Sequence, residues 1–216
     1  MTQRGRFIVV EGLEGAGKST AIDAIKQYLH NLVPDLVITR EPGGTRIGEV
    51  IRHLIKEKID EEPLDPRSEL LLLYAARVQL VEQIILPALN NGSWVLADRF
   101  ELSTFAYQGG GRGIDQDMIR KLSAFCLQGF KPDLVFYLDI DPEQGLSRVK
   151  TRGTFDRIEQ ESLEFFTQIR NTYVQMIKTM DNVILIDAGQ PIEIVQKLIQ
   201  TQLKSLILNH AINKSI

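Results

Sequence analysis

Short apolar segments alternate with longer amphipathic segments along most of the chain. Runs of β-branched and other apolar residues predict strands over 7–10, 36–39, 94–97, 134–138 and 183–186. Apolar residues that recur every three or four positions predict helices through 21–32, 47–55, 70–85, 163–177 and 194–206. The predicted strands are almost continuously apolar, which is typical of parallel strands covered on both faces. The pattern therefore predicts a three-layer α/β fold, in which helices flank a five-stranded parallel sheet.

The polar and glycine-rich interruptions of this pattern are short. The 216 residues contain no internal repeat, low-complexity tract or interdomain linker, so we expect one domain over 1–216. The glycines at 109, 110, 111 and 113 predict a flexible loop, because glycine disfavours helix. In parallel sheets of this kind, ligands bind beyond the carboxyl ends of the strands. The residues that follow each predicted strand are therefore the candidates for a functional site.

Composition narrows the classes of function. With 44% hydrophobic and 25% charged residues, the chain has the profile of a water-soluble globular protein. No apolar run approaches the roughly 18 residues of a membrane helix and no signal sequence is recognisable, so we expect a cytoplasmic protein with no membrane contact. The single cysteine, Cys126, excludes an internal disulfide. A net charge of -3 does not predict binding to nucleic acid.

A phosphate-binding motif follows the first predicted strand. Residues 12–19 read Gly-Leu-Glu-Gly-Ala-Gly-Lys-Ser and match the P-loop pattern G-x-x-x-x-G-K-[ST]. Strand, loop and helix occur in the order that the motif needs, which disfavours a mere glycine-rich turn with a surface lysine. Backbone N–H groups can converge on an anion there, Lys18 can reach the β- and γ-phosphates, and Ser19 can offer its hydroxyl to magnesium. The motif predicts binding of a nucleoside triphosphate.

Charged side chains at the end of the third predicted strand extend this site. Asp98 stands where P-loop proteins place their magnesium partner, and Arg99 beside it is suited to clamping a second anion. An ordinary ion pair at a strand end is the alternative. Arg77 lies on the apolar face of the third predicted helix, where a guanidinium needs a partner. It could form a buried ion pair, extend to the surface, or project into a ligand pocket and donate to a base carbonyl.

A basic segment follows the fourth predicted strand. Residues 148–157 include Arg148, Lys150, Arg152 and Arg157 around a glycine. Such a cluster is either a solvated face or a lid that folds over the triphosphate, with an arginine that stabilises charge on the transferring phosphoryl group. We expect the lid.

Four short motifs occur in the order and spacing seen in one enzyme family. They are Glu-Gly-Leu-Glu-Gly-Ala-Gly-Lys-Ser at 11–19, Arg-Glu-Pro-Gly-Gly at 40–44, Asp-Arg at 98–99 and Ala-Tyr-Gln-Gly at 106–109. With them the chain resembles the thymidylate kinases of the bacterial kind, from residue 7 to about residue 206. The resemblance implies a P-loop nucleoside monophosphate kinase that uses ATP and Mg²⁺ to convert dTMP to dTDP in dTTP synthesis. It also implies a homodimer, for which the apolar helix over 70–86 could supply the interface.

The resemblance assigns the acceptor side of the site by matched position. Glu14 matches the carboxylate that contacts the sugar 3′-hydroxyl, and Tyr107 matches the ring that crowds C2′ and disfavours ribose. Arg77 matches the arginine that reads the thymine O4, Gln108 the residue that bonds the base N3, and Thr104 a small hydroxyl residue near the base. The resemblance also places Glu41, Pro42 and Leu73 against dTMP. It places Arg52 and Arg99 at the phosphate of dTMP.

The ATP side follows from the same resemblance. The positions expected to bind ATP are Gly12, Leu13, Glu14, Gly15, Ala16, Gly17, Lys18, Ser19, Thr20, Arg148 and Arg157. The expected catalytic residues are Lys18, Asp98, Arg99 and Arg152, and Ser19 and Asp98 are the expected magnesium ligands.

Two positions place the chain within the family. Position 15 is Gly, whereas one class of relatives carries a catalytic Arg there. In the other class the cation comes from the lid, which makes Arg152 the first choice and Arg148 or Arg157 the alternatives. Leu73, followed by Tyr74, stands where many relatives have a Phe that stacks on thymine, so the stacking partner stays open.

Two other functions remain at this point. The first is a kinase for another nucleoside monophosphate, although Arg77 and Gln108 favour a pyrimidine with a carbonyl at C4. The second is a P-loop switch ATPase that controls a partner protein. Asn-Lys occurs only at 213–214 and Leu-Ser-Gly-Gly-Gln does not occur, so the guanine-reading and ABC-type motifs of such proteins are missing.

Overall fold

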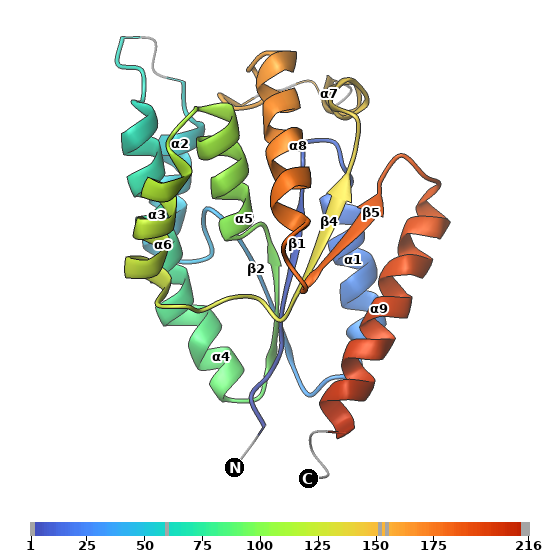
Figure 1. Cartoon of the computed structure of the whole chain (residues 1–216). Helices are drawn as coiled ribbons and strands as arrows, with labels where there is room; N and C mark the ends of the chain where they lie inside the picture. The colour runs from blue at the N-terminus through green and yellow to red at the C-terminus, as the bar shows by residue number, and fades with distance from the viewer. Residues whose placement is uncertain (1–2, 59–60, 151–152, 154–155, 213–216) are drawn as a thin grey trace.

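The expected five-stranded parallel sheet forms the centre of the molecule. The computed structural model describes residues 3–58, 61–150, 153 and 156–212 of the chain. Its strands are β1 Phe7–Gly12, β2 Leu36–Arg40, β3 Trp94–Asp98, β4 Leu134–Asp139 and β5 Val183–Asp187. All neighbouring strands are parallel, in the order β2-β3-β1-β4-β5 (Figure 1).

The strand register brings the chemically interesting strand ends together. Asp98 of β3 pairs with Val10 of β1 on one side and with Arg40 of β2 on the other, and Gly12 pairs with Leu138 of β4. The P-loop and the segments after β2 and β3 therefore start at one edge of the sheet, as expected for parallel strands.

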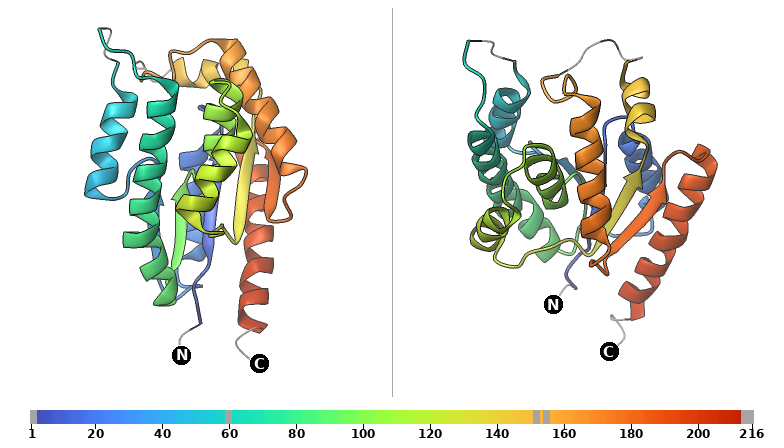
Figure 2. Two further views of the ribbon diagram at one scale, coloured as in Figure 1. Left: turned by 60° about the vertical axis from the view of Figure 1, so that its left-hand side comes forward. Right: turned by 45° about the horizontal axis from the view of Figure 1, so that its top comes forward.

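Helices cover both faces of the sheet, in agreement with the sequence pattern. They are α1 Lys18–Leu29, α2 Arg46–Lys56, α3 Pro66–Leu80, α4 Leu86–Asn90, α5 Glu101–Thr104, α6 Gln116–Leu127, α7 Pro142–Lys150, α8 Leu163–Ile177 and α9 Ile192–Ile212, with π-helical η1 Val81–Ile85 and η2 Phe105–Gly111. The helices α1 and α9 pack on each other, and α8 packs along η2 (Figures 1 and 2). Side-chain caps fix several starts: Asp65 accepts from Arg67 N before α3, and Thr45 accepts from Gly48 N before α2.

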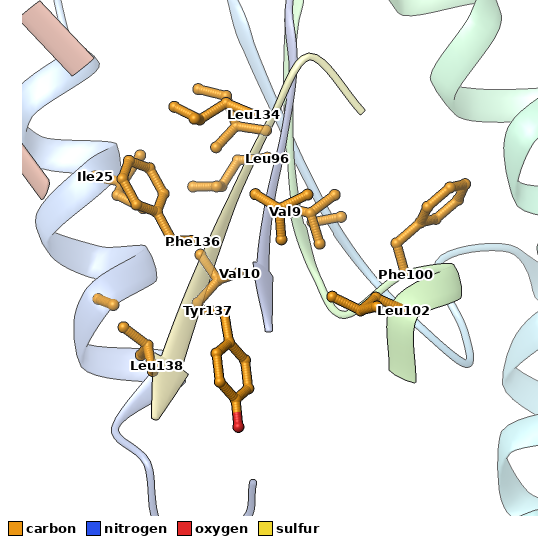
Figure 3. Packing of buried hydrophobic residues seen from close by; sticks show 14 of the residues in the cluster. Val9, Val10, Ile25, Leu96, Phe100, Leu102, Leu134, Phe136, Tyr137 and Leu138 are labelled. Atoms are coloured by element: carbon orange, nitrogen blue, oxygen red, sulfur yellow. The ribbon is translucent and has the colours of Figure 1, made fainter. Parts of the chain in front are cut away.

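The core lies between the sheet and these helices. Phe7, Ile8, Val9 and Val10 of β1 are all inaccessible to solvent, and side chains of β3, β4 and α1 pack around them (Figure 3). Such continuous burial is possible only for a central strand covered on both faces. The near-continuous apolar runs of the sequence are thereby explained.

The segments α3, η1 and α4 follow one another as a helical stretch over Pro66–Asn90. This stretch is 25 residues long and its mean hydropathy reaches 1.4, so by length and composition it could cross a membrane. Core helices of soluble proteins pass the same test, and Leu80, Val81, Ile85 and Leu89 are buried in the core here. The finding is thus weak as an indication of a membrane span.

The glycine run is helical, so the flexible loop expected there is wrong. Gly109, Gly110 and Gly111 belong to η2. A Cβ at Gly110 would lie 2.2 Å from Thr172 Oγ1, and one at Gly111 would lie 2.5 Å from the Phe165 ring. Both neighbours are in α8, so these glycines let α8 approach the η2 backbone closely. Packing between distant segments outweighs the poor helix propensity of glycine here.

The single tryptophan of the chain lies at the other end of the sheet, where the strand β3 begins. Trp94 begins β3 and is buried, with its ring edge-on to His210 of α9 at a centroid distance of 5.4 Å. Arg6 Nε donates to His210 Nδ1 at 3.2 Å, which also ties α9 to the start of β1.

Candidate active site

A cavity of about 580 Å³ opens at the carboxyl edge of the sheet. It receives side chains from the P-loop and α1, from the ends of β2 and β3, and from α2, α3 and η2. The sequence-predicted residues that line it are Glu14, Gly15, Gly17, Lys18, Ser19, Thr20, Glu41, Pro42, Arg52, Leu73, Arg77, Asp98, Arg99, Thr104, Tyr107, Gln108 and Arg148. Residues from widely separated parts of the sequence therefore share one space.

The P-loop forms one end of this cavity. Lys18 Nζ donates to the carbonyl oxygens of Gly12 and Leu13 at 3.1 and 2.8 Å, so the ammonium group is held across the loop. Burial and the neighbouring Arg99 cation lower the pKa of Lys18 to about 8. Gly15 has φ +74°, and a Cβ there would lie 2.1 Å from Gly145 O of α7. This close approach explains why position 15 carries no larger side chain.

Glu14, Arg99 and Tyr107 form a connected cluster next to the P-loop. Arg99 Nη2 donates to Glu14 Oε1 at 2.6 Å and to Tyr107 Oη at 3.0 Å, and Tyr107 Oη donates to Glu14 Oε2 at 2.6 Å. The guanidinium carbon lies 4.9 Å from the centroid of the Tyr107 ring. Arg99 has φ +70°, an uncommon backbone conformation for a residue with a side chain. It turns the chain directly after β3.

Glu11 supports this cluster and was not expected from the sequence as a site residue. Its side chain is inaccessible to solvent at the end of β1. Its oxygens accept from Phe100 N at 2.9 Å, from Ser103 Oγ at 2.5 Å and from Tyr173 Oη at 2.9 Å. Glu11 therefore fixes the segment that follows Arg99. A glutamate inside an apolar strand pattern was the available signal, because a buried carboxylate needs partners.

Asp98 has an unused acceptor beside the P-loop. Its Oδ1 atom is buried and has no hydrogen-bond partner among the described residues, and its side chain lines the same cavity as Ser19. No group of three or more His, Cys, Asp or Glu side chains suited to a metal ion occurs in the described part of the chain. One carboxylate and one hydroxyl are a suitable set for Mg²⁺, which keeps several waters and takes other oxygens from the phosphates. The residues present fit that ion.

Arg77 both forms a buried ion pair and lines the cavity, which are two of the three alternatives that the sequence left open. The side chain is 2% exposed and its Nη2 lies 2.7 Å from Glu41 Oε2, so it forms a buried ion pair. Nη2 also donates to Thr104 Oγ1 at 2.9 Å, but the buried Nη1 has no partner among the described residues. Burial raises the pKa of Glu41 to about 7 despite the Arg77 cation. Arg77 thus lines the cavity with one unused donor.

Gln108 and Leu73 also line the cavity. Gln108 Nε2 donates to Glu69 Oε1 at 2.7 Å, and the glutamine is almost fully buried. Leu73 lines the cavity, whereas the Tyr74 hydroxyl donates to Glu101 Oε1 at 2.8 Å, outside the cavity lining. Of the two candidates for contact with a base, only Leu73 is placed for it.

The arginines after β4 and on α2 contact different parts of the protein. Arg52 Nη1 donates to Pro42 O at 2.9 Å, and Arg148 Nη1 donates to Gly15 O at 3.3 Å. Arg157 Nε donates to Ile55 O of α2 at 2.8 Å and its Nη2 contacts Glu69 of α3, so its described partners are not on the P-loop. Arg152, the first choice for a catalytic cation, lies outside the described residues.

Comparison with known proteins identifies relatives of this chain. The family model described as thymidylate kinase matches residues 10–199. The thymidylate kinase of Legionella pneumophila (strain Corby) is 58% identical over 203 residues, which cover 94% of this chain and 96% of that protein. That of the Paris strain is 57% identical over 203 residues, with the same coverage. The thymidylate kinase of Shewanella frigidimarina (strain NCIMB 400) is 51% identical over 206 residues, which cover 94% of each chain.

Proposed function

Because this chain belongs to the thymidylate kinase family and phosphorylates dTMP to dTDP with ATP, we propose that its cavity holds both nucleotides end to end. Residues 1–216 then work as one kinase domain. The observation that supports this best is that one cavity is lined both by Lys18 and Ser19 of the P-loop and by Arg77 and Gln108. Arg99 lines the same cavity, where two anions can meet beside it.

The base of dTMP is read by one donor and one acceptor. Arg77 Nη1 is the unused buried donor, and it can donate to the C4 carbonyl of thymine. Gln108 directs its Nε2 to Glu69, which leaves Oε1 to accept from N3–H. Cytosine presents an amino group and a bare nitrogen at these two positions, so it mismatches both. Leu73 packs on the base in place of an aromatic ring, and Thr104 holds Arg77 in place.

The sugar lies beside Glu14 and Tyr107. Glu14 accepts from the 3′-hydroxyl, and the Tyr107 ring occupies the space that a 2′-hydroxyl would need. Arg99 holds both side chains in position through its hydrogen bonds. It also binds the acceptor phosphate, together with Arg52, while Glu41 and Pro42 form the adjoining wall of the cavity.

Phosphoryl transfer needs positioning rather than a strong base. The second pKa of a phosphate monoester is about 6, so the dTMP phosphate is largely a dianion at neutral pH. Lys18 neutralises the β- and γ-phosphates of ATP, and Arg99 brings the acceptor oxygen into line against charge repulsion. Asp98 and Ser19 would hold Mg²⁺, which supplies further neutralisation of phosphate charge. The lid cation is Arg152, or Arg148, which already contacts the P-loop.

The assembly and location follow the family expectation. The helices α2, α3 and α6 lie on one side of the molecule (Figures 1 and 2), and we propose that a second copy of the chain covers the exposed apolar side chains that these helices carry. They are Ile47, Val50, Leu54, Leu71, Met118 and Phe125. We further propose that the enzyme works in the cytoplasm, without nucleic-acid or membrane partners.

An assay of ADP release over a panel of nucleoside monophosphates tests the proposal. ADP release should depend on added dTMP and should be much slower with dCMP, AMP or GMP. Lys18→Ala should lower turnover by orders of magnitude, because it removes the charge on the transferring phosphates. Lys26→Ala is the matched control, since Lys26 lies exposed on the same helix.

A folded Lys18→Ala enzyme with wild-type turnover would exclude the proposed phosphate site. ATP consumption that is independent of any monophosphate would instead support a switch ATPase.

A further inference from the structure

The carboxylate of Glu69 lines the cavity next to the base-reading residue Gln108. Glu69 belongs to the first turn of α3 and its side chain is 1% exposed. Three groups from other segments point at it: Gln108 from η2, Arg112 just after η2, and Arg157 from the segment between α7 and α8. Two guanidinium groups therefore compensate the buried negative charge.

We propose that Glu69 is a positioning residue for base specificity, which fixes the orientation of the Gln108 side-chain amide. This inference rests on the proposed role of Gln108 in reading the base. A carboxylate between two cations can only accept hydrogen bonds. The 2.7 Å contact to Glu69 Oε1 must therefore come from the NH₂ end of Gln108, whichever way an amide is drawn.

The consequence for the cavity is a fixed acceptor. With Nε2 engaged by Glu69, Gln108 Oε1 takes part in no hydrogen bond within the described part of the chain. It can then accept from N3–H of thymine or uracil. It repels the unprotonated N3 of cytosine, because two acceptors face each other. Glu69 thereby contributes to the choice of substrate through the orientation of Gln108.

Glu69→Gln is the informative substitution, because it keeps the size of the side chain and removes its charge. A glutamine has only one acceptor oxygen, and the Arg157 guanidinium at Oε2 attracts it there. The amide nitrogen then faces Gln108 and favours the flipped orientation, with Gln108 Nε2 in the cavity. That orientation suits an acceptor at N3 instead of a donor.

Steady-state kinetics with three substrates separates this role from a general loss of structure. In Glu69→Gln, kcat/KM for dTMP and for dUMP should fall together by about tenfold or more, since both bases present the same N3–H and C4 carbonyl. The preference for dTMP over dCMP should fall by a similar factor, while KM for ATP changes less than about twofold. Glu69→Asp keeps an acceptor-only group and should retain the preference.

The matched control is Glu161→Gln. Glu161 Oε1 accepts from Arg112 Nη1 at 2.5 Å, so this change neutralises a carboxylate of the same cluster that does not contact Gln108. It should leave the preference for dTMP over dCMP unchanged. If Glu69→Gln lowers kcat/KM for all three monophosphates by one common factor, the role is merely structural and the inference is overturned.

Gln108→Leu tests the proposed base reading by Gln108 separately from the positioning role of Glu69. If this variant keeps the wild-type preference, the proposed base reading itself fails. If it loses the preference but Glu69→Gln does not, only the inference about Glu69 fails.

Should Glu69→Gln not fold, NMR of ¹⁵N-glutamine-labelled wild-type enzyme replaces it. Slow solvent exchange of the Gln108 amide protons supports the bond to Glu69, and exchange as fast as at an exposed glutamine refutes it.

Discussion

At the residue scale, three glutamates of the cavity are paired with arginines before any nucleotide binds. Glu14 holds Arg99, Glu41 holds Arg77, and Glu69 holds Arg157. Pairing reduces the cost of burying these charges and fixes the arginines in the places where phosphate and base are expected. Lys18 is the cation that loses its proton more easily than usual, because burial and the Arg99 cation lower its pKa.

Lys18 should make ATP binding depend on pH. Its pKa of about 8 lies below the usual value for lysine, although Glu14 and Asp98 favour the charged form. A bound triphosphate also favours the charged form, so the pKa must rise on binding. Above about pH 8 binding therefore takes up a proton, and the dissociation constant of ATP should increase by up to about tenfold per pH unit.

Calorimetric titration of the wild-type enzyme with ATP measures this dependence. Repeating it in buffers of different ionisation enthalpy reports the proton uptake directly. Lys18→Met should bind ATP more weakly and should show no uptake in the alkaline range. An affinity that stays constant from neutral pH to about pH 10 would contradict the low pKa of Lys18.

The sequence identified most of the cavity residues but not their partners. The P-loop, Asp98 and Arg99 follow strands, so the rule that sites lie at strand ends was enough to find them. The partners Glu41 of Arg77 and Glu69 of Gln108 depend on how α3 lies against β2 and η2. No local pattern encodes that placement.

At the element scale, strands were easier to predict than helices. The strand starts expected from the apolar runs agree with the structure, because a central parallel strand has no polar face to obscure its pattern. The helices α5, α6 and α7 were missed, and η2 was taken for a loop. Three glycines interrupt the helical pattern of η2, and the close approach of α8 explains two of them, Gly110 and Gly111.

Gly110→Ala should destabilise the fold through the contact between η2 and α8. An added Cβ would lie 2.2 Å from Thr172 Oγ1 and 3.0 Å from Gln168 O, so the two segments must separate. We expect the free energy of unfolding to fall by about 1–3 kcal/mol, as for other overpacked sites. Urea denaturation followed by circular dichroism measures the change.

Gly109→Ala serves as the comparison in the same element. The nearest atoms to its Cβ would be side-chain atoms of Ile119 and Gln116 at 3.3 and 3.5 Å, which can move, and the backbone Ile114 O would lie at an ordinary contact distance of 3.8 Å. Its effect should stay within about 1 kcal/mol. Equal losses in both variants would mean that glycine flexibility, not the approach of α8, determines the stability of η2.

At the scale of the whole molecule, two sides of the fold differ in what they expose. The side formed by α2, α3 and α6 carries the proposed dimer surface, while α9 lies on the other side of the sheet (Figure 2). Val50 of α2 is 60% exposed and Phe125 of α6 is 80% exposed, so neither is needed to fold one copy. A contiguous exposed apolar patch is typical of an interface, and the proposed dimer requires these side chains to form one.

Val50→Asp should convert the dimer to a monomer without unfolding it, because an unpaired carboxylate would be buried at the interface. Analytical ultracentrifugation at several protein concentrations measures the change in mass. Leu198→Asp on α9 is the control, since Leu198 is 45% exposed on the opposite side. It should leave the mass unchanged. A wild-type enzyme that sediments as a monomer at all concentrations would remove the proposed assembly.

The position of Trp94 gives the molecule an internal optical probe. The indole begins β3, and Asp98 ends the same strand about 13 Å away, at a rise of about 3.3 Å per residue. The emitting ring touches His210 and is remote from the nucleotides. Changes in tryptophan fluorescence therefore follow the detachment of the C-terminal helix from the sheet, and stay silent while substrates enter and leave.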